Sequence, residues 1–86
     1  MTKPGDRVGA ILEADSEIVY LIGYGVYDGD FDHPDWGFLN PRITLDDGRV
    51  VWGCECWWAS EKQIKEFIVD LKVVIVPVRE KDRGRL

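Results

Sequence analysis

The first residues that could do chemistry are four aspartates crowded into a short segment. Asp28, Asp30, Asp32 and Asp35 surround His33, and alternating carboxylates in a flexible segment are typical of calcium loops. The EF-hand pattern is broken, because its sixth position holds His33 instead of glycine and its twelfth holds leucine instead of glutamate. We interpret the segment as an acidic, solvated loop and leave open weak divalent binding in an irregular site.

Two cysteines and the single histidine are the nearest approach to a zinc site. Cys54 and Cys56 lie two positions apart in an expected strand, so both point to one side, too far apart for a relaxed disulfide. Zinc signatures use paired ligand motifs, whereas here one Cys-x-Cys pair is joined only by the distant His33. We expect buried core thiols beside Trp52, with no metal and no cofactor.

Catalysis has few residues to use. The chain has two serines, Ser16 and Ser60, and the spacing around Ser60 makes it a helix cap. With His33 as the single histidine, a nucleophile–base pair would need a distant loop and strand to meet. Glu55 could pair with a loop aspartate as an acid–base couple, but no motif joins them. The sequence has no glycine-rich phosphate loop, and we expect that the protein is not an enzyme.

Aromatic residues beside the acidic segment give the main functional signal. Tryptophan and tyrosine supply much of the energy of interface hot spots, and an acidic rim around them favours a cationic ligand. The candidate partner-binding residues are Tyr27, Phe31, Trp36, Trp57, Asp28, Asp30, Asp32, Asp35 and Glu55. The alternative is that the loop aromatics pack against the domain.

The charge distribution narrows the class of partner. The 86 residues include 11 Lys and Arg against 16 Asp and Glu, for a net charge of −5. Residues 79–86 carry four bases and two acids, so residues 1–78 carry seven bases and fourteen acids, a net charge of −7. Such a surface repels phosphate backbones, so nucleic-acid binding is disfavoured. The chain lacks a long apolar run and a secretory signal layout, which predicts a cytoplasmic protein outside membranes.

Short strands and one helix must position these residues. The expected elements are strands at 7–13, 18–27, 42–45, 49–57 and 73–78, a loop at 28–41 and a helix at 61–71. Gly23 and Gly25 alternate on one face of their strand, which predicts a sharp bend or a close backbone crossing. Ser60 and Gln63 fit a capping box that starts the helix.

Two turns indicate the architecture. Gly5-Asp6-Arg7-Val8 opens the first strand, and Asp46-Asp47-Gly48 predicts a tight hairpin. At fold level this arrangement resembles the SH3-like small β-barrels. We predict an α+β, mainly β domain over residues 1–78. It forms either a half-open SH3-like barrel or an antiparallel sheet of about five strands with one helix (about 61–71) before the last strand. Residues 79–86 are expected to be a charged, flexible tail.

These observations predict a non-catalytic binding module for a protein or a basic peptide. A second copy of the chain is a further candidate partner, through the edge strand at 73–78. One alternative is a protein that sequesters a small or nucleotide-like ligand in an aromatic pocket. A lesser alternative is a small domain supported by a metal.

Overall fold

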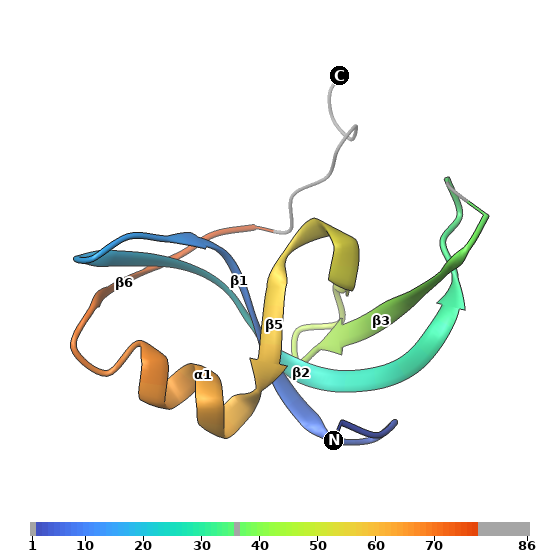
Figure 1. The fold of residues 1–86 in the computed structure, drawn as a ribbon, viewed down its shortest axis with the longest axis horizontal. Coiled ribbons are helices and arrows are strands. Elements are labelled where there is room, and N and C mark those ends of the chain that lie inside the picture. Colours follow the sequence, from blue (N-terminus) through green and yellow to red (C-terminus); the bar gives the residue numbers. More distant parts are fainter. Residues whose placement is uncertain (1, 36, 78–86) are drawn as a thin grey trace.

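Two long strands form the centre of the molecule, which a computed structural model describes over residues 2–35 and 37–77 (Figure 1). β1 (Arg7–Ala14) and β2 (Ile18–Asp32) pair antiparallel through a tight turn. Asp15 stabilises this turn, because its carboxylate accepts hydrogen bonds from the backbone N–H groups of Glu17 and Ile18, both at 2.8 Å. The short polar segment between the strands therefore reverses the chain.

The other described elements are shorter (Figure 1). They are β3 (Leu39–Leu45), β4 (Val50–Trp52), the 3-10 helix η1 (Gly53–Glu55), β5 (Trp57–Ser60), α1 (Glu61–Phe67) and β6 (Lys72–Ile75). The strand order is β4-β3-β2-β1-β5, and these neighbours are all antiparallel. β6 lies outside this path and pairs with β2 in parallel.

β2 is bent because two strands share one of its edges. Residues 18–21 pair with β6, and residues 25–32 pair with β3. At the start of the β3 pairing, a Cβ added to Gly25 would lie 2.6 Å from the Cα of Leu45 and would overlap the carbonyl oxygen of Thr44. Only glycine fits there, which confirms the close backbone crossing expected at this pair of glycines.

The sheet buries apolar side chains on both of its faces. One core contains Val8, Ala10, Ile22, Ile43, Leu45 and Val51. The other contains Ile11, Val19 and Leu21, which lie beneath Ile64 of α1. Gly9 permits this helix to approach, because an added Cβ would lie 3.0 Å from the Cβ of Ile64. Alternation along β1 therefore sends successive side chains into two separate cores.

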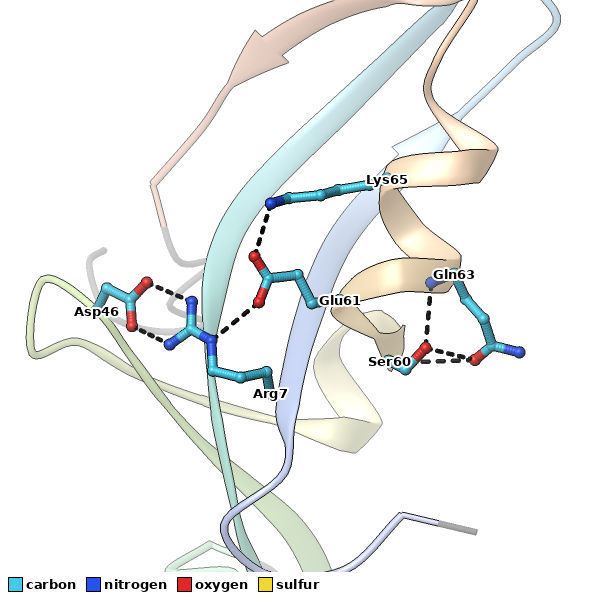
Figure 2. A network of polar contacts seen from close by, with 6 residues as sticks. All are labelled: Arg7, Asp46, Ser60, Glu61, Gln63 and Lys65. Carbon is cyan, nitrogen blue, oxygen red and sulfur yellow. Dashed lines mark hydrogen bonds and ion pairs between the residues drawn. The ribbon is translucent and has the colours of Figure 1, made fainter.

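The expected capping box begins α1. The backbone N–H of Gln63 donates to Ser60 Oγ at 3.1 Å, and the N–H of Ser60 donates to Gln63 Oε1 at 3.3 Å (Figure 2). The helix ends at Phe67 instead of residue 71, because the chain then enters a turn in which the N–H of Leu71 donates to the carbonyl of Ile68. Both of these turn residues still pack on the second core, as their helical spacing with Ile64 predicts.

An ion-pair network of Arg7, Asp46, Glu61 and Lys65 joins β1, the β3–β4 turn and α1 (Figure 2). Arg7 donates to both carboxylate oxygens of Asp46, at 2.6 and 2.7 Å, and to Glu61 at 2.9 Å. Arg7 holds the pKa of Asp46 below its usual range, and Lys65 and then Arg7 do the same for the pKa of Glu61. The network fixes α1 against the sheet at the surface.

The prediction of an α+β, mainly β fold is confirmed, in its antiparallel-sheet form with one helix. The sheet is not closed into a barrel, because β4 and β5 end the strand order over the described residues without pairing with each other. η1 divides the strand expected at 49–57, which makes six strands within the described ranges instead of five. The strand expected at 73–78 is seen as β6, followed by Pro77, while Val78 and the predicted tail at 79–86 lie outside the described residues.

The loop expected at 28–41 is wrong over most of its length. β2 continues to Asp32 and pairs there with Leu39, the first residue of β3. The polar segment joins the sheet because its charges are satisfied across the strands: the carboxylate of Asp28 accepts hydrogen bonds from Arg42 at 3.1 Å and Thr44 at 2.6 Å. We call this outer part of the β2–β3 hairpin, residues 27–35 and 37–44, the arm.

Candidate functional site

The structure separates the predicted partner-binding residues into two groups. The arm carries Tyr27, Asp28, Asp30, Phe31, Asp32 and Asp35. Trp57 instead begins β5, which lies beside β1. Figure 1 shows the arm on one side of the molecule, with α1 and the β1–β2 turn on the other. Glu55 lies in η1, and Trp36 lies outside the described residues.

Two of the four aspartates on the arm, Asp28 and Asp30, contact other residues of the arm through their carboxylates. Asp28 is held by Arg42, whose guanidinium carbon also lies 3.9 Å from the centre of the Phe31 ring. The hydroxyl of Tyr27 donates to Asp30 at 2.8 Å, and this hydrogen bond raises the pKa of Tyr27. At Asp28 and Phe31, the cation is therefore Arg42 of the chain itself.

His33 has a structural position at the base of the turn in the arm. It is buried, with 3% of its surface exposed, and its ring lies 4.8 Å from that of Trp52. Nδ1 accepts a hydrogen bond from the backbone N–H of Asp35, and Nε2 lies 3.9 Å from the carboxylate of Glu55. The Glu55 carboxylate also accepts a hydrogen bond from the N–H of Trp52. These contacts fasten the arm to η1.

The two cysteines do not share one strand face, because η1 interrupts the strand that was expected to carry them. Cys54 is exposed, which contradicts the prediction of a core thiol, and its N–H donates to Asn40 at 3.0 Å. Cys56 packs against the first core, as predicted, and burial raises its pKa to about 12. Across residues 2–35 and 37–77, no three His, Cys, Asp or Glu side chains gather as a metal site requires.

Trp57 is the most exposed of the large apolar side chains described, at 77%. It lies opposite Ile11 in the β1–β5 pairing and therefore on the face that α1 covers. Its neighbour Trp58 points to the other face and stacks on Tyr27 with the ring centres 5.2 Å apart. Trp58 therefore packs on a core, whereas its neighbour Trp57 lies on an open surface.

Two hollows meet at Trp57, and together we call them the Trp57 groove. The apolar hollow has a volume of about 240 Å³ and is lined by Ile11, Trp57, Trp58, Ala59, Gln63, Ile64 and Phe67. The acidic hollow has a volume of about 410 Å³ and is lined by Ile11, Leu12, Glu13, Ala14, Asp15, Trp57 and Phe67. Because three of these residues are shared, the hollows form one continuous surface.

Sequence reasoning found Trp57 but missed the rest of this groove. The helical spacing of Ile64, Phe67, Ile68 and Leu71 predicts one buried apolar stripe, yet 52% of the surface of Phe67 is exposed. Glu13 and Asp15 belong to a strand end and a turn, where charged residues are ordinary. The one available signal was that Phe67 lies at the edge of the apolar stripe of α1, beside the hydrophilic face.

A larger hollow, of about 750 Å³, lies between Arg7 and α1 over the ion-pair network. An anion entering it would have to displace carboxylates, because Arg7 is bound by Asp46 and Glu61, and Lys65 by Glu61. The ion pairs therefore make this hollow a poor site for an anion.

No helix within the described ranges has the length and apolar character needed to cross a bilayer. The sequence matches no family model, and comparison with curated proteins and with solved structures finds no match.

Proposed function

We propose that this protein is a non-catalytic binding module whose Trp57 groove receives a protein segment carrying apolar and basic side chains. The observation that carries the proposal is that Trp57, 77% exposed, lies between the apolar hollow and the acidic hollow. A large aromatic ring beside concave apolar surface is typical of interface hot spots, because covering it removes much apolar area from water while few rotors are fixed.

Charge supports a cationic partner. Glu13 and Asp15 edge the acidic hollow, and none of its seven described lining residues is basic. Hydrogen bonds from the backbone of Glu17 and Ile18 hold the pKa of Asp15 below its usual range, so this carboxylate is ionised at neutral pH. The net charge of −5 adds long-range attraction for a basic segment.

A small flat ligand is the second candidate function. The volume of about 410 Å³ in the acidic hollow falls within the range of small-molecule sites. Tyr27 and Trp58 already stack on each other, so a flat ring would have Trp57 and Phe67 as its aromatic partners. Such a ligand would be cationic for the same electrostatic reason as the protein segment.

Selection from a random peptide library displayed on phage tests the proposal. We expect the enriched peptides to combine an apolar residue with a nearby Lys or Arg. Synthetic, fluorescein-labelled copies should bind the wild-type protein in fluorescence anisotropy titrations. Trp57→Ala should weaken this binding at least about tenfold, as expected for a hot-spot aromatic.

Phe38→Ala is the matched control, because Phe38 is another exposed aromatic, at 53%, but lies on the arm. It should leave the affinity unchanged. Failure of the library to yield a binder, or binders equally insensitive to both substitutions, would overturn the proposal. Binders that depend on Phe38 and not on Trp57 would move the site to the arm.

A further inference from the structure

β1 continues beyond the strand that covers its outer edge. β5 pairs with Val8–Ile11 and begins at Trp57, whereas β1 extends to Ala14. The backbone N–H of Asp15 donates to the carbonyl of Ile18 in β2. Because backbone groups alternate in direction along a strand, the N–H and C=O of Ala14 point to the opposite edge, where β5 has not begun.

Among residues 2–35 and 37–77 no strand pairs with this edge, which forms one wall of the Trp57 groove. Leu12, Glu13 and Ala14 line the acidic hollow together with Trp57. The chain that precedes Trp57 leaves in another direction, since the N–H of Cys54 donates to Asn40, which pairs with Phe31 near the turn of the arm. Ala14 is exposed, so an incoming backbone can reach it.

We infer that the partner segment binds as an added β-strand along the edge of β1 at residues 12–14, in line with β5. This inference rests on the proposed function of the Trp57 groove and specifies how the segment is held. Strand addition supplies affinity through backbone hydrogen bonds, and the side chains on one face supply specificity.

The side chains along this edge lie on both faces of the sheet. Ile11 pairs with Leu21 on the α1 face, whereas Leu12 packs on the first core. A bulge follows Ile11, and Glu13 pairs with Tyr20, which lies between Val19 and Leu21 and therefore faces away from α1. The bound strand places an apolar side chain against Trp57 and Phe67, and a Lys or Arg beside the carboxylates that edge the acidic hollow.

N-methylation of the bound peptide tests strand addition without altering the protein. The probe is the most enriched peptide of the display selection, synthesised with one backbone N–H methylated at a time. We expect alternate positions to lose about tenfold in affinity, because only every second N–H faces β1, and the positions between them to bind normally. Replacing the basic residue of the peptide with Gln should also weaken binding, because the cation no longer meets the carboxylates that edge the acidic hollow.

Ala14→Pro tests the protein side, because proline removes the edge N–H while leaving the side chains of the groove in place. Ala14→Val, which keeps the N–H, is its control. Binding that depends on Trp57 but shows no alternation in the N-methyl series would overturn strand addition and leave the proposed function standing. If no selected peptide binds in a way that depends on Trp57, both strand addition and the proposed function are overturned. If Ala14→Pro fails to fold, the N-methyl series decides alone.

Discussion

The neighbouring residues Trp57 and Trp58 should differ sharply in their contribution to stability. Trp57 keeps 77% of its surface exposed, so it buries roughly 60 Å² of the 250 Å² or so that a tryptophan can bury. At about 25 cal/mol per Å², its replacement by alanine should cost at most about 1.5 kcal/mol. Trp58 packs on the first core and stacks on Tyr27, and removal of a packed tryptophan costs about 3–5 kcal/mol.

Urea unfolding followed by far-ultraviolet circular dichroism measures this difference without relying on tryptophan emission. We expect Trp57→Ala to shift the unfolding midpoint slightly with an unchanged slope, and Trp58→Ala to leave little folded protein. Trp58→Phe, which keeps an aromatic ring against Tyr27, should recover much of the loss. Equal destabilisation by both alanine substitutions would mean that Trp57 is a core residue in solution. The Trp57 groove would then be no open site.

Three further outcomes follow from particular contacts. Gly25→Ala should destabilise the fold by about 3 kcal/mol or more in urea titrations, since the added Cβ would lie 2.6 Å from the Cα of Leu45; a neutral effect would contradict the close crossing. The pKa values of Asp46 and Glu61 are lower in the folded protein than their ordinary values of 3.8 and 4.5. These carboxylates therefore stabilise the fold above pH 3.8 and 4.5, and this stabilisation is lost as the pH falls through the lower folded pKa values. Arg7→Gln should flatten this acid dependence of the urea midpoint, and an unchanged profile would refute the assignment. Iodoacetamide should alkylate exposed Cys54 well before Cys56, whose buried thiol has a pKa of about 12; mass spectrometry of the two peptides reads out the order, and equal rates would contradict it.

Elements fixed by local chemistry could be predicted from the sequence. The capping box at Ser60 depends on residues three positions apart, and the Asp46–Gly48 hairpin depends on a glycine that adopts φ +93°. Both signals act within a few residues, so no tertiary contact is needed to read them. The bend of β2 could also be predicted, because a glycine such as Gly25 within an apolar strand marks a bend or a close backbone approach.

The missed features depend on contacts between distant residues. Asp28 belongs to a strand only because Arg42 and Thr44 bind its carboxylate, from fourteen and sixteen positions away. The break in the strand expected at 49–57 is an exception, because it is local: the carboxylate of Glu55 accepts a hydrogen bond from the N–H of Trp52, three positions earlier, where the strand ends and η1 begins. This break separates Cys54 from Cys56, so a period of two assigned their faces wrongly.

The Trp57 groove could not be predicted, because it lies where β1 extends beyond the first residue of β5. No residue type marks the position at which β5 begins beside β1, and Phe67 reaches the groove through the docking of α1. Alternation along a strand places neighbouring residues such as Trp57 and Trp58 on opposite faces. It could not say which face would be covered, since both faces of this sheet carry a core.

An open strand edge beside an exposed tryptophan is a liability unless something limits what pairs with it. Here Glu13 and Asp15 provide that limit, because two copies of this edge would bring their carboxylates together. The same charges attract a basic strand, so one feature both opposes self-pairing through β1 and selects the partner. Neutralising them with Glu13→Gln and Asp15→Asn should therefore weaken capture of a basic peptide and increase self-association in sedimentation velocity. A double variant that lost peptide binding yet stayed monomeric would separate the two effects and refute the second role of the carboxylates.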